Sequence, residues 1–392
     1  MKIGLIHEGK IPADNRVALT PAKCAFIERL FSCKIIVEPS PTRCFSDAEF
    51  EAEGIEVSSD LSDCDFLMGI KEVPIDRLLA GKTYLFFSHT IKKQPHNRAL
   101  LQAVLEKKIT LIDYEVLTDD YNQRLIAFGK FAGMVGAHNG ILGYGLRTGA
   151  FTLPRMKDVE SYAEARSIYK ETPYPPLSIV VSGGGRVAKG AMEVLLDMGF
   201  KKVAPTDFLV EKFDRPVFTQ IHPIDYVARK DGEPFEKADF YRKTDIFINC
   251  IFFDRRAPMF FSAEEMKQPD FRIKMIADVS CDLMPTSSLP STIKTTTIED
   301  PFFGFDVFHN AESNNSFSGN AVTVMAIDNL PNELPRDASE YFGEQFIINI
   351  LPELQAVLRG ESSKIIDRAM IAKAGRLTTK YRYLEDYVMD NG

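Results

Sequence analysis

The sequence predicts an α/β protein built from two doubly wound domains with a cleft between them. Three observations predict this fold class. Short apolar runs alternate with longer amphipathic segments, which is typical of parallel strands covered by helices. A glycine-rich loop follows a run of β-branched residues near the middle of the chain. The length of 392 residues suffices for two or three domains, each with its own core.

The first strand-and-helix series occupies the N-terminal part of the chain. Short apolar runs predict strands that are buried on both faces, at residues 2–6, 34–38, 65–70, 83–88 and 110–114. The segments 21–31 and 95–108 have the spacing of amphipathic helices. Strands that alternate with helices in this way predict a parallel sheet with helices on both faces.

A second series begins after residue 177. Residues 129–149 are rich in glycine yet apolar, which predicts a closely packed helix leading into a second domain. The polar residues 152–176 are interpreted as a linker or surface excursion, and residues 245–253 and 272–280 as later strands. A helix over 318–335 is expected to lead back. We therefore expect two Rossmann-like domains, a substrate domain of residues 1–133 with 322–392, and a dinucleotide-binding domain of residues 134–321.

Composition excludes several classes of protein. The net charge of −8 and the isolated lysine pairs argue against nucleic-acid binding. No apolar stretch is long enough for a membrane span, and the N-terminus is interpreted as a strand and not a signal peptide. The six cysteines lack the spacing of a zinc site or a disulfide framework, so we expect reduced thiols, no metal and a cytoplasmic location.

The segment SIVVSGGGRVAKGA, residues 178–191, has the pattern of a dinucleotide-binding loop. Gly183 permits a tight turn, Gly185 lets backbone N–H groups approach a pyrophosphate, and the small Ala188 allows close packing of helix and strand. The helix that follows contributes a partial positive charge at its N-terminus. A plain structural glycine turn is the alternative interpretation.

Asp207 lies 24 residues beyond Gly183, after the apparent strand KKVAPTD. A carboxylate at such a position would accept a hydrogen bond from the ribose of NAD. No arginine directly follows it, which favours NAD, with NADP not excluded. The cofactor-binding residues that we expect are Gly183, Gly184, Gly185, Arg186, Val187, Asp207 and Cys250.

Ionisable residues follow the predicted strands of the first domain. They are Arg16, Lys71, Glu72, His89, Lys92, Glu115 and, slightly further on, Arg124. Each one alone could be a solvated strand end, but parallel strands bring their carboxyl ends to one edge of a sheet. Neighbouring charges perturb each other's ionisation, as a lysine or histidine base at neutral pH requires. Arginine suits a carboxylate, so the set predicts a substrate with several carboxylates and an amine.

Several stretches of the sequence resemble a known protein family. The stretches FFSHTIK, LIDYE and IDNLPNELPRDASEYFG resemble lysine-forming saccharopine dehydrogenase, and still more the lysine–2-oxoglutarate reductase half of bifunctional aminoadipic semialdehyde synthase. The resemblance spans nearly the whole chain. RVALTP and the Lys71/His89 pair are shared with alanine dehydrogenase and with the NAD-binding subunit of transhydrogenase.

This resemblance implies a reaction and roles for individual residues. Saccharopine would be oxidised at its secondary amine, and the imine hydrolysed to lysine and 2-oxoglutarate. Lys71 corresponds to the base that deprotonates the amine, and His89 to the acid–base group for imine hydration. Glu72 and Glu115 would tune these two groups. Arg16, Lys92, Arg124 and Asp328 would hold the substrate.

Departures from the family leave alternatives open. Dehydrogenase relatives have glycine at the position of Ser182 and cysteine at that of Val187, so this chain cannot link that loop to Cys250 by a disulfide. Relatives include both NADPH and NAD enzymes. An alanine-type dehydrogenase acting on pyruvate and ammonia, and a dinucleotide-binding module without activity, are the alternatives. His7 and His138 are interpreted as structural.

Overall fold

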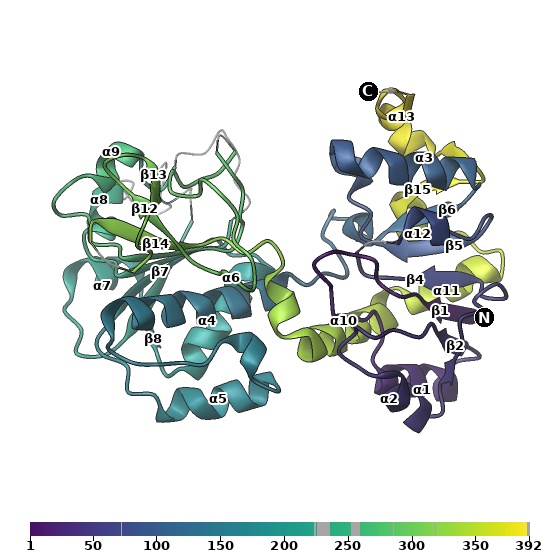
Figure 1. Ribbon diagram of the computed structural model, residues 1–392, viewed down its shortest axis with the longest axis horizontal. Helices are drawn as coiled ribbons and strands as arrows, with labels where there is room; N and C mark the ends of the chain where they lie inside the picture. Colours follow the sequence, from purple (N-terminus) through teal and green to yellow (C-terminus); the bar gives the residue numbers. More distant parts are fainter. Residues whose placement is uncertain are drawn as a thin grey trace. The chain divides into compact units, whose positions relative to one another are not determined.

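The computed structural model comprises two compact units. The first contains Met1–Ala127 and Pro335–Gly392, and the second contains Phe128–Leu334 (Figure 1). The structure describes the chain except for residues 72, 223–224, 226–235, 252–258, 285, 318 and 390–392. The boundaries between the units lie at 127/128 and 334/335, and not at the expected 133/134 and 321/322. Residues 322–334 belong to the second unit because β14, Ala321–Met325, is a strand of its sheet.

The first unit contains an eight-stranded sheet in the order β16-β15-β6-β5-β4-β1-β2-β3. Its parallel strands are β1 (Lys2–Leu5), β2 (Lys34–Val37), β3 (Glu56–Val57), β4 (Phe66–Met68), β5 (Thr83–Phe86) and β6 (Thr110–Asp113). The chain runs from β1 to β3 in one direction and from β4 to β6 in the other. This is the predicted doubly wound topology, with a switch point between β1 and β4, where ligands bind in such sheets.

The C-terminal part of the chain completes this unit. β15 (Met370–Lys373) pairs antiparallel with β6, and β16 (Arg376–Leu377) forms the edge. The helices are α1 (Pro21–Leu30), α2 (Asp47–Ala52), α3 (Arg98–Glu106), α10 (Pro335–Asn349), α11 (Leu351–Leu358), α12 (Lys364–Ala369) and α13 (Glu385–Met389). Helix α10 packs against α1, and α13 packs against α3.

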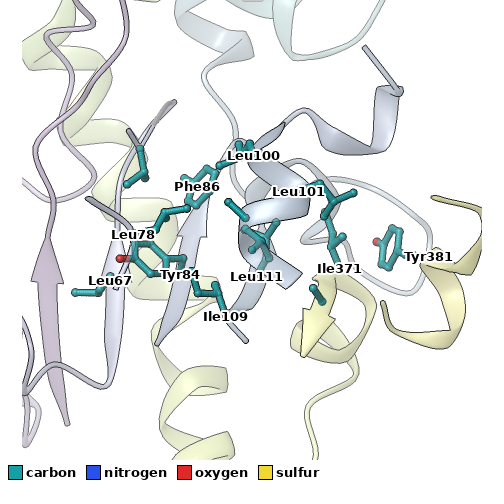
Figure 2. Packing of buried hydrophobic residues seen from close by; sticks show 14 of the residues in the cluster. Leu67, Leu78, Tyr84, Phe86, Leu100, Leu101, Ile109, Leu111, Ile371 and Tyr381 are labelled. Carbon is teal, nitrogen blue, oxygen red and sulfur yellow. The ribbon is translucent and has the colours of Figure 1, made fainter. Parts of the chain in front are cut away.

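One apolar core joins the N-terminal and C-terminal segments of the first unit. Figure 2 shows Leu67, Tyr84 and Phe86 from β4 and β5 packed with residues from far along the chain. Ile371 and Tyr381, which come from the C-terminal segment, are part of the same cluster. Burial of these side chains is the main stabilising contribution to this unit.

The second unit contains another eight-stranded sheet, in the order β13-β12-β14-β11-β10-β7-β9-β8. The strands not yet named are β7 (Ser178–Ser182), β8 (Lys201–Lys202), β9 (Val217–Ile221), β10 (Ile246–Asn249), β11 (Met275–Asp278), β12 (Phe303–Asp306) and β13 (Ala311–Ser313). Strands β7 to β11 and β14 are parallel, while β12 and β13 are antiparallel at one edge. The switch point lies between β7 and β10, beside the glycine loop.

Helices α4 (Gly129–Thr148) and α6 (Arg186–Asp197) pack backbone against backbone in the second unit. A Cβ at Gly133 would lie 1.8 Å from the carbonyl oxygen of Val187. A Cβ at Gly190 would lie 2.0 Å from that of Lys130. The predicted glycine-rich helix and its close packing are therefore confirmed, because only glycine fits at these two positions.

Two predictions about secondary structure are wrong. Residues 152–176 contain α5 (Tyr162–Glu171), which is capped by Ser161 and buries Ala165 and Tyr169. Residues 318–335 do not form one helix, since β14 is followed by a short 3₁₀ helix at Leu330–Glu333. The β-branched run within β14 fits a fully buried strand better than a helix.

Candidate active site

Polar side chains in the first unit gather at the carboxyl ends of neighbouring strands. Lys71 follows β4, His89 follows β5, and Glu115 follows β6. The loop after β1 contributes Glu8 and Arg16. The strand order places the ends of β4, β5 and β6 side by side, as expected from the sequence for Lys71, His89 and Glu115.

The Lys71 side chain is largely buried over an aromatic floor. Its Nζ lies 5.8 Å from the ring centroid of Phe87, which packs edge-on against Tyr114 at 5.2 Å. Burial, together with the positive charges of Arg16 and Lys10, lowers the pKa of Lys71 to about 8. A lysine with this pKa can release and accept a proton near neutral pH.

Glu8 fixes the backbone that carries Lys71. Its carboxylate accepts hydrogen bonds from the backbone N–H groups of Ile70 and Lys71, the second at 2.9 Å. These two N–H groups lie just beyond β4, so the carboxylate replaces the partner that a longer strand would provide. Glu8 stands in the same loop as Arg16, but no pattern in the sequence distinguishes it.

His89 begins a 3₁₀ turn with a left-handed backbone, at φ 55°. Its neighbour Ser88 donates a 2.5 Å hydrogen bond to the buried carboxyl of Asp113 at the end of β6. Burial, followed by the charges of Lys71 and Lys92, lowers the pKa of His89 to about 3. The imidazole of the ligand-free protein is therefore neutral.

Glu115 is the centre of a cluster with two cations. One of its carboxylate oxygens lies 3.2 Å from Lys92 Nζ and 2.7 Å from Arg124 Nη2. Burial raises the pKa of Glu115, but the charges of Lys92 and Arg124 and the hydrogen bond from Lys92 outweigh burial, so the pKa is lowered. The cluster carries a net positive charge when all three partners of the ion pairs are ionised, and it suits an anionic substrate group.

Arg16 is bound to a carboxylate of the protein itself. Its Nε and Nη2 donate to the two oxygens of Asp14 at 2.9 and 2.5 Å, and both residues are at most 2% exposed. A small cavity beside this pair is lined by residues that include Glu8, Asp14, Arg16, Gly69 and Ile70. Sequence analysis found the arginine but missed Asp14, which neutralises it.

Glu72 and Asp328 are the other residues predicted for the substrate site. Glu72 lies outside the described residues. Asp328 lies in the second unit, exposed in a turn after β14. Among the described residues, the strand order gathers Lys71, His89 and Glu115. Arg16, Lys92 and Arg124 lie beside them.

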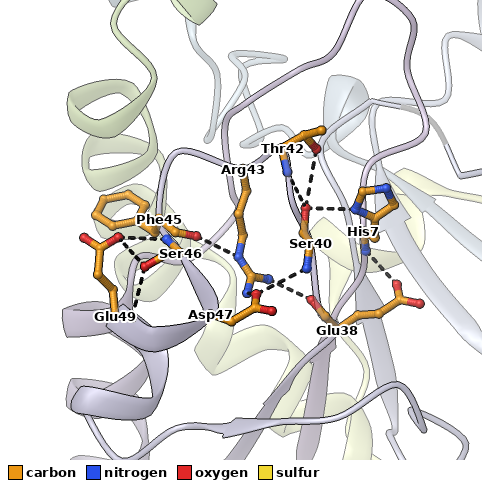
Figure 3. A network of polar contacts seen from close by, with 9 residues as sticks. All are labelled: His7, Glu38, Ser40, Thr42, Arg43, Phe45, Ser46, Asp47 and Glu49. Atoms are coloured by element: carbon orange, nitrogen blue, oxygen red, sulfur yellow. Dashed lines mark hydrogen bonds and ion pairs between the residues drawn. The ribbon is translucent and has the colours of Figure 1, made fainter.

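The two histidines interpreted as structural have hydrogen-bond partners. His7 contacts Ser40 through Nδ1 at 2.8 Å and donates its backbone N–H to Glu38, in the polar network of Figure 3. His138 contacts the Tyr169 hydroxyl and the Pro154 carbonyl, both at 2.8 Å. Each imidazole connects segments of its own unit, which supports the structural interpretation.

The glycine loop of the second unit forms a tight turn between β7 and α6. Gly183 has φ +89°, and its N–H donates to the Ile221 carbonyl at 2.8 Å. Gly184, Gly185 and Arg186 are exposed, and a Cβ at Gly185 would meet no atom within 4 Å. The first turn of α6 thus faces open space, which fits a pyrophosphate.

Asp207 is not placed where the ribose interpretation requires. It lies in the helix α7 (Pro205–Val210), after the two-residue strand β8 at the edge of the sheet. The strand beside β7 is β9, and His222 and Asp225 follow it. The His222 ring lies against the loop, because a Cβ at Gly184 would be 2.7 Å from its Cε1.

Two further residues predicted to bind the cofactor are partly or fully enclosed by protein. Val187 is partly buried on the side of α6 that faces α4, where its carbonyl oxygen adjoins Gly133. Cys250 follows β10 and is buried, and burial raises the pKa of its thiol. All six cysteines are present as thiols. Within the described residues, no cluster of three or more His, Cys, Asp or Glu side chains could hold a metal ion, and no helix could span a membrane.

Comparison with protein families and curated sequences shows which proteins this chain resembles. Residues 4–135 match the family model "Alanine dehydrogenase/PNT, N-terminal domain". A saccharopine dehydrogenase [NAD(+), L-lysine-forming] from Emericella nidulans is 29% identical, and the alignment covers 89% of this chain and 91% of that protein. The corresponding enzyme from Neurospora crassa is also 29% identical, with 91% of each chain covered.

A longer relative is similar over only part of its length. Alpha-aminoadipic semialdehyde synthase from Arabidopsis thaliana is 30% identical over 97% of this chain, but the alignment covers 41% of that protein. The chain thus spans less than half the length of this relative.

Among solved structures, L-alanine dehydrogenase superposes with a TM-score of 0.68 at 15% identity, over 99% of this chain and 100% of that chain. A transhydrogenase from Sinorhizobium meliloti superposes with a TM-score of 0.57 at 13% identity, over 96% and 99% of the two chains. These likenesses establish the two-domain α/β fold.

Proposed function

Since the chain is a homologue of the L-lysine-forming saccharopine dehydrogenases, we propose that it reversibly oxidises the secondary amine of saccharopine to give L-lysine and 2-oxoglutarate. The observation that carries the proposal is the depressed pKa of Lys71, at the switch point of a sheet whose neighbouring strand ends supply His89 and Glu115. The near-complete alignment with these shorter relatives supports the same conclusion.

In this reaction Lys71 acts as the base. Its neutral form removes the proton from the substrate's secondary ammonium group, which leaves a lone pair on nitrogen. A nicotinamide dinucleotide, when bound, accepts the hydride from the adjacent carbon. The product is an iminium ion, and water must then add to its carbon, with loss of a proton, before the carbon–nitrogen bond breaks.

His89 is suited to the water-addition steps. In the neutral state that burial imposes, the imidazole can accept a proton from the attacking water. A substrate carboxylate beside Lys92 would offset the positive charges that depress this pKa, and so would make His89 a stronger base. Glu115 orients Lys92 and Arg124 toward the anionic part of the substrate.

The dinucleotide is proposed to be NAD, with its pyrophosphate on the N–H groups at the start of α6. The exposed Gly184 and Gly185 leave space for it. Asp225, which accepts a 2.7 Å hydrogen bond from the His222 N–H after β9, replaces Asp207 as the candidate for the ribose. A carboxylate there disfavours the additional phosphate of NADP by charge repulsion. The thiol state of the cysteines supports a reducing, cytoplasmic location.

The ribose assignment predicts different effects for two aspartate variants. Asp225→Ala should weaken NAD binding about 10- to 150-fold, because a charge-assisted hydrogen bond contributes about 1.5–3 kcal/mol. Asp207→Ala should leave NAD binding unchanged. Calorimetric titration of both variants with NAD distinguishes the two positions, and the opposite ranking would restore Asp207.

Gly185→Ala tests the phosphate site without disturbing the fold. The added methyl meets no protein atom within 4 Å, so the free energy of unfolding should change by less than about 0.5 kcal/mol. It would occupy the space of the pyrophosphate, and we expect NAD affinity to fall at least tenfold. Denaturant unfolding and NAD titration measure the two effects separately.

The proposed reaction is tested by absorbance at 340 nm with NADH or NADPH, lysine and 2-oxoglutarate. Oxidation of the nucleotide that requires both co-substrates supports the proposal and identifies the cofactor. Turnover only with pyruvate and ammonium would instead assign an alanine-type activity. Binding of dinucleotide without turnover in any mixture would leave a binding module and overturn the proposal.

A further inference from the structure

A chain of buried polar side chains connects the carboxyl ends of β7, β10 and β11 in the second unit. Ser182 Oγ donates to Asn249 Oδ1 at 2.8 Å, and Asn249 Nδ2 donates to Asp278 Oδ1 at 2.9 Å. All three residues have an exposed fraction of zero. They are the last residues of three adjacent parallel strands, at the switch point of the sheet.

Further hydrogen bonds connect these three polar side chains to neighbouring residues. Asn249 Nδ2 also lies within donor distance of Ser280 and Ser288, and the second Asp278 oxygen accepts from Thr292 at 2.6 Å. Ser280 Oγ donates to Asp278 Oδ1 at 2.7 Å. Burying polar groups costs free energy unless each one is paired, and an apolar set would fill the same space without that requirement. Polar residues at this place therefore indicate a role in positioning the backbone around them.

Ser182 makes its side-chain hydrogen bonds directly before the glycine turn. Ser182 Oγ accepts the N–H of Cys250 at 3.0 Å, which ties the segment after β10 to the residue before Gly183. A Cβ at Gly183 would lie 2.8 Å from Ile251 and 3.1 Å from the Cys250 carbonyl oxygen. A side chain at position 183 would therefore clash with the segment after β10, and the hydrogen bond from Cys250 holds that segment in place.

We propose that Ser182, Asn249 and Asp278 form a positioning unit that holds the dinucleotide crevice open in its binding shape. The inference rests on the proposed dinucleotide function and deepens it. The three residues act through the backbone of Gly183 and Cys250 and do not touch the ligand themselves. Loss of the unit weakens binding of the nicotinamide dinucleotide, while the substrate residues of the first unit are unaffected.

The test compares two variants that each remove one buried hydroxyl. Ser182→Ala removes the donor to Asn249 and the acceptor of the Cys250 N–H. Thr244→Ala is the matched control, since Thr244 is 1% exposed and its hydroxyl donates to Phe240 O at 2.7 Å, at the opposite end of β10. Ser182→Thr restores a hydroxyl. Calorimetric titration with NAD, NADH and NADPH, denaturant unfolding, and KM for each substrate are measured for all proteins.

We expect Ser182→Ala to bind NAD about tenfold more weakly, with KM for lysine and 2-oxoglutarate within twofold of the wild type. Thr244→Ala should lose comparable unfolding stability but retain NAD affinity, and Ser182→Thr should recover most of the affinity. Equal NAD affinity in Ser182→Ala and Thr244→Ala would overturn the proposal. Failure of the wild type itself to bind NAD, NADH or NADPH would reject the dinucleotide function, and this inference with it.

Discussion

Replacement of Lys71 by methionine is expected to reduce kcat for saccharopine oxidation by about 10²–10⁴-fold, the usual contribution of a general base. Methionine has a similar length and suits the apolar surroundings of Phe87, but it cannot accept a proton. Steady-state kinetics with saturating saccharopine and NAD measure the effect. Lys93→Met is the control, because Lys93 lies over the Tyr383 ring at 5.3 Å and has no proposed role in catalysis.

The same variant has an expected pH signature. With a pKa of about 8, Lys71 becomes neutral as the pH rises, so wild-type kcat/KM for saccharopine should increase toward pH 8 and level off above it. The residual kcat/KM of Lys71→Met should not show this increase with pH. If the variant kept wild-type activity and pH dependence, Lys71 would not be the base.

Unfolding measurements separate loss of chemistry from loss of structure. Between pH 8 and the usual lysine pKa of about 10.4, the unfolded chain binds more protons at Lys71 than the folded chain does, so wild-type stability rises with pH in that window. Below pH 8 the folded protein bears the full cost of the buried charge. Lys71→Met should therefore be more stable at neutral pH, by about 1–3 kcal/mol.

Gly133→Ala is expected to destabilise the second unit by about 3 kcal/mol or more. The new methyl would lie 1.8 Å from the Val187 carbonyl oxygen, a backbone atom that moves only if α4 and α6 separate. Denaturant unfolding monitored by circular dichroism measures the change. Because Val187 stands in the first turn of α6, NAD affinity should also fall.

Gly129→Ala provides the comparison within the same helix. A Cβ at Gly129 would make ordinary contacts, the nearest at 3.5 Å from Val187 Cγ2. We expect a change in unfolding free energy within about 0.5 kcal/mol, in either direction. Similar losses in both variants would mean that glycine flexibility, and not the close approach of the two helices, explains the sequence of α4.

The sequence predicted those parts of the site that depend on regular structure. Lys71, His89 and Glu115 were identifiable because each follows a buried apolar strand, and the order of a doubly wound sheet brings such ends together. Glu8 and Asp14 were missed because they lie in the long segment after β1, where no periodicity indicates which side chains turn inward.

The placement of Asp207 differs from the sequence-based expectation for a different reason. KKVAPTD looks like a strand that ends in a carboxylate, yet only Lys201–Lys202 pair with a neighbour. Pro205 and Asp207 instead occupy the first turn of α7, where proline and acidic residues are favoured. Sequence spacing from the glycine loop cannot show which of two successive strands lies beside β7. That choice depends on sheet pairing over a long range.

The discontinuous composition of the first unit has a consequence for protein synthesis. Its last strands and the helices from Pro335 onward are made only after the whole second unit has been translated. The second unit is a single continuous segment, so it can complete its sheet first. Before the C-terminal segment is made, β6 lacks its neighbouring strand β15. The apolar core of the first unit also lacks the side chains of Ile371 and Tyr381. On the ribosome, the half of the molecule that begins first should therefore be the half that becomes protease-resistant last.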